Sequence, residues 1–151
     1  MTKLATIGYE GSNLADFIAA LEAAKVTVLV DVRAVPVSRK KGFSKNQLAA
    51  ALEDAGIGYV LLAGLGTPKE GRDAAKAGRR DEFRRVYDAH MGTQAFRDDL
   101  ARAATITGDG GACLMCWERD PAVCHRSIVA ALLSETHGFQ VRHLDVPETP
   151  N

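Results

Sequence analysis

Short apolar runs alternate along this chain with segments spaced like amphipathic helices, and this alternation limits the folds open to it. The run at 26–32, VTVLVDV, is nearly all apolar and rich in β-branched residues, as expected of a strand covered on both faces of a parallel sheet. Leu14, Phe17 and Leu21 instead follow the spacing of a helix with one buried face. Repeated strand and helix predict a three-layer α/β/α sandwich with a mostly parallel sheet of about five strands, Rossmann-like or rhodanese-like.

Turn and capping residues set the expected boundaries. The stretch 64–78 is rich in glycine and charge, which predicts a long exposed loop or a marginal helix. Strands are expected at 4–7, 26–32, 57–62, around Cys113 and at 141–144. Ser12 or Asn13 is expected to cap the first helix, Ser44 and Gln47 to form a capping box, Thr93 to cap a later helix, and Gly138 to end the helix at 127–137.

Length and composition favour one domain. The 151 residues are 46% hydrophobic, which suits a single α/β domain over 1–145 followed by a frayed tail at 146–151. Lys and Arg together number 19, as do Asp and Glu, so no global charge draws the chain to nucleic acid or to a membrane. No apolar run approaches the roughly 20 residues of a membrane span, so a soluble protein is expected.

The number of cysteines is informative about the cellular compartment in which the protein is expected. Their odd number, three, and the lack of a secretory signal pattern argue for a reducing cytoplasm and for free thiols. We therefore expect a cytoplasmic protein without a disulfide framework. The pattern does not fix its oligomeric state.

The stretch CWERDPAVCHRSIVAALL, which starts at Cys116, gathers chemically active side chains at one strand-to-helix turn. In open parallel sheets, ligands bind at the carboxyl ends of strands, where helix N-termini present free N–H groups. If Cys124 opens the last helix, the helix dipole and Arg126 favour its thiolate, although a small buried cysteine is an equal alternative. Arg126 itself needs an anion, either a bound phosphate or sulfate or a carboxylate such as Asp31.

Other residues of this stretch have both a functional and a structural interpretation. Glu118 is a general acid or base if partly buried, or else the partner of Arg119 or Arg126. His125 is a second candidate for proton transfer, and Cys116 a second candidate nucleophile. Trp117 could stack on a base but more often such a residue packs in the core or at its rim, and Cys113 is expected in the core on the opposite strand face. The spacing of Cys116, Cys124 and His125 matches no common zinc pattern, so neither a metal nor another cofactor is predicted.

A second group of residues follows the run at 26–32. Arg33, Arg39, Lys40, Lys41 and Lys45 occur with no acidic residue between Asp31 and Glu53. This segment, the basic loop, is locally positive and suits phosphate binding. A solvated basic surface is the alternative. The turn GYEG at 8–11 also opens a helix, but Glu10 would repel a phosphate, which leaves Tyr9 as a ligand contact or as core packing.

These motifs together carry a family resemblance. TIGY, then VDVRAVPVSRKKGFS, then CWERDPAVCHRSIVAALL cover nearly the whole chain, and their order resembles the bacterial and archaeal family named domain of unknown function 488. The resemblance implies a compact α/β domain whose polar motifs converge, and it implies no established reaction. The residues concerned are Tyr9, Asp31, Arg33, Ser38, Arg39, Cys116, Glu118, Cys124, His125 and Arg126.

A weaker similarity is to rhodanese-like sulfurtransferases and related thiol phosphatases. There, a short loop between the catalytic cysteine and the arginine wraps an anion. The stretch from Cys116 to Arg126 is too long for that loop, and the stretch from Cys124 to Arg126 is too short.

Three hypotheses about function follow. The first is an enzyme that acts on a phosphate-bearing substrate, a nucleotide or nucleic acid, with the basic loop and Arg126 holding phosphate, Glu118 or His125 moving a proton, and a thiol as nucleophile. The second is thiol-dependent sulfur transfer or phosphatase-like chemistry at Cys124 or Cys116. The third is a noncatalytic module that binds nucleic acid or another ligand.

Overall fold

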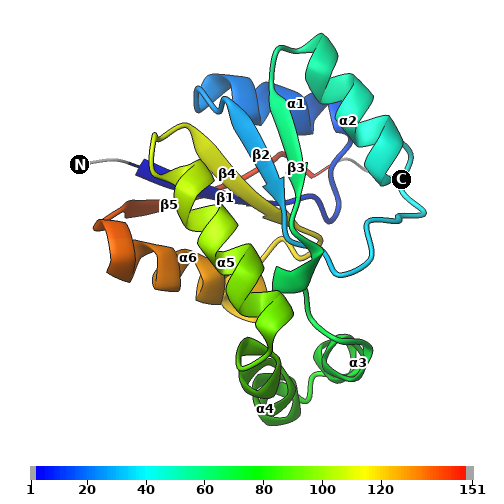
Figure 1. Ribbon diagram of the computed structural model, residues 1–151. Helices are drawn as coiled ribbons and strands as arrows, with labels where there is room; N and C mark the ends of the chain where they lie inside the picture. The colour runs from blue at the N-terminus through cyan, green and yellow to red at the C-terminus, as the bar shows by residue number, and fades with distance from the viewer. Residues whose placement is uncertain (1–2, 149–151) are drawn as a thin grey trace.

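A computed structural model describes residues 3–148 of the chain, which form one five-stranded sheet. All four strand pairings are parallel, and the strand order is β3-β2-β4-β1-β5 (Figure 1). The strands are β1 (Lys3–Gly8), β2 (Val28–Asp31), β3 (Gly58–Leu61), β4 (Ala112–Cys116) and β5 (Gln140–Leu144). The predicted parallel α/β fold and its number of strands are therefore confirmed.

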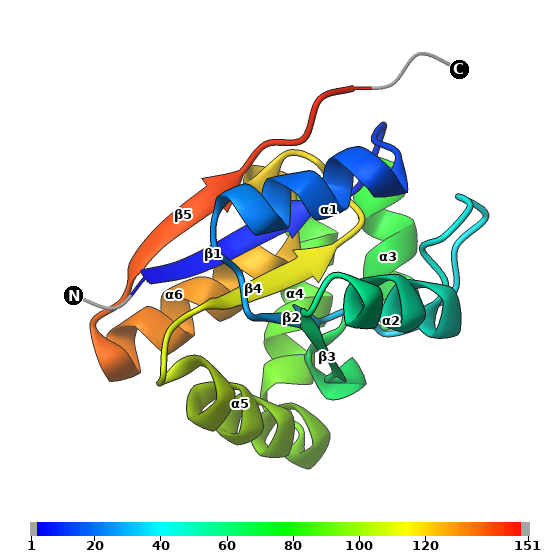
Figure 2. The same ribbon diagram turned by 90° about the horizontal axis from the view of Figure 1, so that it is seen from above.

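Six α-helices accompany the strands within these residues, and they cover both faces of the sheet (Figure 2). They are α1 (Leu14–Ala23), α2 (Lys45–Asp54), α3 (Lys69–Lys76), α4 (Arg80–Met91), α5 (Gln94–Thr107) and α6 (His125–His137). Helices α1 and α2 pack on one face through Phe17, Leu21, Leu48 and Leu52, together with the strand residue Cys113. Helices α4, α5 and α6 supply Tyr87, Phe96 and Val129 to the core on the opposite face, where Cys116 and Cys124 also lie. Two cores on two faces make the sandwich three-layered.

Local capping explains where several helices begin and end. The Asn13 side chain accepts a hydrogen bond from the Asp16 N–H at 2.8 Å, and Thr93 does the same for Phe96 at 3.3 Å, as predicted. Gly138 ends α6 with a φ of 68°, a left-handed conformation that glycine adopts without steric cost.

The predicted capping box at Ser44 and Gln47 is wrong. Ser44 does precede α2, but its hydroxyl makes no cap hydrogen bond and instead pairs with the backbone N–H and carbonyl of Ser38. Gln47 accepts from the Gly42 N–H at 3.2 Å. Both side chains thus hold the basic loop against the start of α2. The spacing of Ser44 and Gln47 in the sequence does not show that their hydrogen bonds go to this loop.

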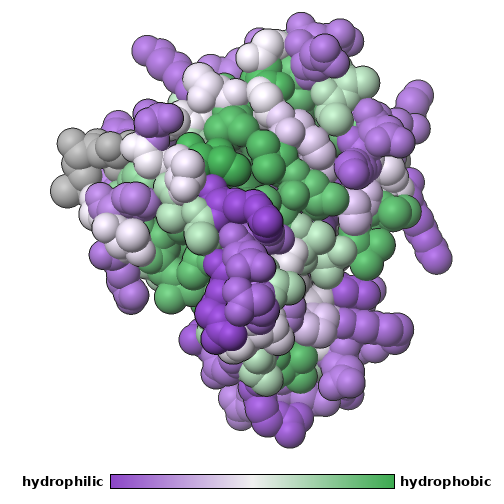
Figure 3. All heavy atoms as spheres, viewed as in Figure 1, coloured by the Kyte–Doolittle hydropathy of each residue, from purple (hydrophilic) through white to green (hydrophobic). Residues whose placement is uncertain are grey.

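The stretch at 64–78 contains a helix, which is the second of its two predicted alternatives. A 3₁₀ turn at Ala63–Leu65 leads into α3, which has Ala74 buried, and α3 packs beside α4. Hydrophilic side chains gather over these two helices in Figure 3, at the bottom of the view. Val146 is 2% exposed, so the packed chain reaches past residue 145, and residues 149–151 of the expected tail lie outside the described range. Within 3–148, no helix is long and apolar enough to cross a membrane.

Candidate functional site

The carboxyl ends of β1, β2 and β4 bring the predicted site residues to one edge of the sheet. Asp31 pairs in register with Met115, and Gly8 with Cys116, so the segments after the three strands start side by side. The Glu10 N–H donates to the Trp117 carbonyl at 2.8 Å, and the Val32 N–H to the Met115 carbonyl at 3.1 Å. These residues then divide into two groups, one on each face of the sheet.

The first group is a buried network around Arg33. Its guanidinium donates from Nε and Nη2 to the two carboxylate oxygens of Asp31, with the shortest distance, 2.7 Å, from Nη2 to Oδ2. Nη1 donates to the Phe43 carbonyl at 2.7 Å and to the Tyr9 hydroxyl at 3.2 Å. The Tyr59 hydroxyl donates to Asp31 at 2.6 Å. Asp31 is therefore the partner of Arg33, and the expected alternative pairing of Asp31 with Arg126 is wrong.

Burial and the contacts with Asp31 shift the pKa values of two members of this network, Arg33 and Tyr59. Burial alone lowers the pKa of Arg33, but the hydrogen bonds and charge of Asp31 outweigh burial and raise it. Burial, followed by the hydrogen bond to Asp31, raises the pKa of Tyr59. Tyr9 stacks on Phe43 with ring centroids 4.5 Å apart. Because their polar atoms bind one another, Tyr9, Asp31 and Arg33 act as a frame that holds the basic loop.

The basic loop itself presents lysines to a cavity. Ser38 accepts from the Lys40 N–H at 3.1 Å, whereas Arg39 is exposed. Lys40 and Lys41 line a cavity of about 540 Å³ at the start of α1. The other lining residues are Ser12, Asn13, Leu14, Gly42 and Gln47.

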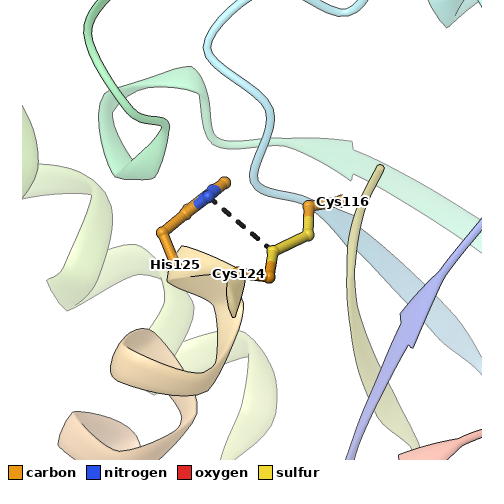
Figure 4. Close-up of side chains that lie close together, drawn as sticks. All are labelled: Cys116, Cys124 and His125. Carbon is orange, nitrogen blue, oxygen red and sulfur yellow. Dashed lines mark hydrogen bonds between the residues drawn. A yellow bond between two sulfur atoms is a disulfide. The ribbon is translucent and has the colours of Figure 1, made fainter. Parts of the chain in front are cut away.

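The second group is built around a disulfide between Cys116 and Cys124. The expectation of free thiols is thus wrong for these two residues and holds for Cys113, which is buried on the opposite face. Cys116 ends β4, and Cys124 precedes α6 at a sequence separation of 8. The 3₁₀ turn at Pro121–Val123 lies within the intervening segment. The two sulfurs meet between the end of β4 and the start of α6 (Figure 4). The number of cysteines in a sequence does not reveal which of them come together in the fold.

His125 stands beside this disulfide in a defined tautomer. One ring nitrogen, Nε2, lies 2.7 Å from the Val32 carbonyl, and because a carbonyl only accepts, Nε2 carries the proton. The unprotonated Nδ1 lies 3.9 Å from Cys124 Sγ (Figure 4). Burial lowers the pKa of His125 to about 4, so the imidazole is neutral near pH 7.

Arg126 is fully buried, with an exposed fraction of 0%, and the protein itself supplies its partners. Nη1 lies 3.2 Å from Cys116 Sγ and also donates to the Glu118 carbonyl. Nε donates to the Thr6 hydroxyl at 3.1 Å, and Nη2 to the Arg119 carbonyl at 3.2 Å. Burial lowers the pKa of Arg126. The partners of Arg126 are therefore backbone carbonyls, a hydroxyl and a sulfur, in place of the bound anion or carboxylate that the sequence predicted.

Glu118 and Trp117 take different positions. Glu118 Oε2 lies 3.4 Å from Cys116 Sγ, and burial raises the pKa of its carboxyl group. In the disulfide this sulfur has no proton, but a Cys116 thiol would have Glu118 as its acceptor. Trp117 is 44% exposed, so it lies on the surface and outside the core.

Arg119 is a structural residue that the sequence treated only as a partner of Glu118. Its backbone N–H donates to the Glu10 carboxylate at 3.0 Å, and its Nε to the Glu10 carbonyl at 3.1 Å. Its Nη1 donates to the Val146 carbonyl. Glu10 therefore anchors the segment after β4, and that role gives a physical reason for a carboxylate in the turn after β1.

A second cavity, of about 410 Å³, opens at Cys124. Helix α4 contributes Arg80, Asp81, Phe83 and Arg84 to its lining, and the start of α6 contributes Ser127 and Ile128. These α4 residues were not selected as site candidates from the sequence, because no local pattern places α4 beside Cys124. The dense charge of RRDEFRR is a sequence signal that could have drawn attention to them.

The fold and the site define a parallel α/β domain with a buried cysteine pair and a histidine at the strand-to-helix turn. This chain belongs to the family whose model is described as Domain of unknown function DUF488, which matches residues 13–133. The resemblance inferred from the motifs is thereby confirmed. No curated protein and no solved structure matches the chain.

Proposed function

We propose that the chain is a thiol-dependent sulfurtransferase in which Cys124 attacks a persulfide and Cys116 resolves the product. The observation that carries the proposal is the joining of Cys116 to Cys124, the second of which lines a cavity. Arg33 and Arg126 are occupied by the protein, which weakens the hypothesis that they hold a phosphate.

The neighbours of Cys124 suit a nucleophile. The Arg126 backbone N–H points at Cys124 Sγ at 3.5 Å from the first turn of α6, where the helix dipole favours a thiolate. His125 Nδ1 accepts the thiol proton. Because burial disfavours the imidazolium, the proton passes on to the departing thiolate. In this first step, a Cys124 S–S bond forms, the S–S bond of the donor R–S–SH breaks, and R–SH leaves.

Cys116 has the surroundings of a resolving thiol. Glu118 Oε2 takes its proton, and Arg126 Nη1 stabilises the resulting thiolate. The Cys116 thiolate attacks Cys124 Sγ, which forms the disulfide and releases the outer sulfur as hydrosulfide. The two cysteines lose two electrons and the transferred sulfur gains them. An external dithiol then reduces the disulfide for the next turnover.

The test uses reduced full-length protein and a small alkyl persulfide. Hydrosulfide release is expected from the parent and from Cys113→Ser, the matched control, and not from Cys124→Ser. Cys116→Ser is expected to retain one added sulfur atom on Cys124, visible by mass spectrometry. Release by Cys124→Ser at the parental rate would overturn the proposal. So would alkylation of both Cys116 and Cys124 no faster than a peptide thiol below about pH 7.

A second candidate function is binding of a phosphate-bearing ligand, with or without catalysis. The cavity lined by Lys40 and Lys41 supports it, because two cations face one hollow in a chain of zero net charge. Nucleotides and short single-stranded DNA and RNA are the probes. Binding should weaken in Lys40→Ala with Lys41→Ala and persist in Lys76→Ala, an exposed lysine of α3. Equal binding by both variants would refute this site.

A further inference from the structure

Three ligand-type atoms meet at the cysteine pair. Cys116 Sγ, Cys124 Sγ and an imidazole nitrogen of His125 lie within 4.8 Å of one another, and all three residues are buried. Figure 4 shows the histidine ring directed at the sulfurs from the start of α6. Their sequence spacing predicted no metal, since residues that end a strand and open a helix need not follow a standard motif.

The surroundings of His125 are those of a metal ligand. Histidine ligands usually donate their second ring N–H to a carbonyl or carboxylate, which fixes the tautomer and the ring orientation. His125 Nε2 donates to the Val32 carbonyl in this way, at 2.7 Å. Nδ1 is thereby left as a lone-pair donor on the side of Cys124. Arg126 adds hydrogen bonds to both sulfurs, from Nη1 to Cys116 and from its backbone N–H to Cys124.

The backbone spacing suits two separated sulfurs. The Cα atoms of Cys116 and Cys124 lie 7.4 Å apart, beyond the roughly 4.4–6.8 Å that disulfides usually span. Two thiolates on one tetrahedral zinc, each at about 2.3 Å, stand about 3.8 Å from each other. Once reduced, the cysteines can separate their sulfurs to that distance without bringing their backbones closer.

We propose that the reduced protein binds one Zn²⁺ through Cys116, Cys124 and His125. Two thiolates cancel the charge of the ion, so the ion and its two sulfur ligands together carry no net charge. Two cysteines and one histidine with an open fourth position form a donor set used by catalytic zinc. Since Cys124 lines the second cavity, the fourth position is open to water or a small ligand there.

Oxidation releases the ion. When a disulfide oxidant takes two electrons from the thiolates, Cys116 and Cys124 join, the oxidant becomes two thiolates that take protons from water, and Zn²⁺ leaves with its charge unchanged. The proposal uses the same thiols as the sulfurtransferase but does not rest on it. Metal binding and hydrosulfide release are separate measurements, so either can fail alone.

The test titrates the reduced, metal-stripped chain with Zn²⁺ against a chromophoric chelator, and with Co²⁺ as a spectroscopic probe. One ion per chain is expected in the reduced form and none in the oxidised form. Co²⁺ should give thiolate charge-transfer absorption and the visible bands of a tetrahedral site. His125→Ala should weaken binding by more than the roughly 10–100-fold typical of losing an outer-sphere contact. His137→Ala, an exposed histidine of the same helix, and Cys113→Ser are the matched controls.

Two results would overturn the zinc site. One is Zn²⁺ binding by the reduced parent no tighter than by a Cys116→Ser, Cys124→Ser double variant. The other needs no variant and is a Co²⁺ spectrum of the parent without thiolate charge transfer. Folding of each variant is checked by circular dichroism, and a variant that fails to fold leaves the parent spectrum to decide.

Discussion

His125 donates from Nε2 to the Val32 carbonyl at 2.7 Å, and this bond ties the start of α6 to the end of β2. The bond thus links the segment that leads into the Arg33 network to the residues around the disulfide, although the two groups lie on opposite faces of the sheet. The bond also fixes which nitrogen faces Cys124. Both proposals for the cysteine pair depend on that nitrogen being unprotonated.

The buried imidazole predicts acid sensitivity. Burial lowers the pKa of His125 from 6.5 in the unfolded chain to about 4 in the folded protein. Between these values the unfolded state binds more protons, so the free energy of unfolding should fall as the pH drops from about 6.5 to about 4. The full loss is about 3 kcal/mol, reached below pH 4. Urea unfolding at a series of pH values measures it.

Carboxyl groups also titrate in this pH range, so the contribution of His125 is obtained by comparing the pH dependence of the parent with that of a His125 variant. His125→Gln should flatten the pH dependence in that window, whereas His137→Gln, on the exposed side of α6, should retain it. Parallel curves for the parent and His125→Gln would show that His125 does not set the slope.

The disulfide predicts a definite thiol count. The chain has three cysteines, of which Cys113 is free. Protein equilibrated with oxidised thiol buffer and then denatured should titrate one thiol per chain, and three after reduction. In Cys113→Ser the first count should be zero. Three titratable thiols in the denatured oxidised parent would contradict the pairing of Cys116 with Cys124.

Local patterns predicted the elements of this fold well. The apolar run at 26–32 contains β2, and Gly138 ends α6, because strand burial and a left-handed helix end are consequences of nearby residues. Asn13 and Thr93 cap their helices for the same reason. Over 64–78 the sequence pattern left a loop and a marginal helix open, and the burial of Ala74 against its neighbours supports the helix, α3, despite the glycines.

Partners at a distance could not be predicted from the sequence. The sequence pattern predicted that Asp31 and Arg126 lie at the same edge of the sheet. It did not show which guanidinium Asp31 would bind, and in the structure Asp31 pairs with Arg33. Likewise, Cys116 and Cys124 meet only because a turn folds the segment between them. The sequence thus predicted which residues belong to the site, whereas only the tertiary structure shows which of them bind one another.

The Arg33 network predicts a large cost for removing its carboxylate. Asp31→Asn leaves a buried guanidinium without its counter-charge, which should lower the free energy of unfolding by about 3–5 kcal/mol. Asp88→Asn is the control, because its pair with Arg84 is half exposed on both sides and should change stability by about 0.5 kcal/mol or less. Equal losses would mean that the buried pair contributes no more than the exposed one. Denaturant unfolding of both variants decides this.

The last prediction concerns Gly8, where β1 passes the segment after β4. A Cβ atom at Gly8 would lie 1.8 Å from the Glu118 carbonyl oxygen, and Arg126 holds that same carbonyl. Neither backbone can give way cheaply, so Gly8→Ala should destabilise the fold by about 3 kcal/mol or more. Because Glu118 follows Cys116 closely, the displaced segment should also form the disulfide more slowly in a defined thiol buffer.

Gly92→Ala provides the matched control for this prediction. Gly92 follows α4 with a φ of −82°, and a Cβ there would meet its nearest atom at 3.4 Å. Its effect on the free energy of unfolding should stay within about 1 kcal/mol, with disulfide formation unchanged. If Gly8→Ala were as mild as Gly92→Ala in both measurements, the close approach of β1 to Glu118 would not be what positions Cys116.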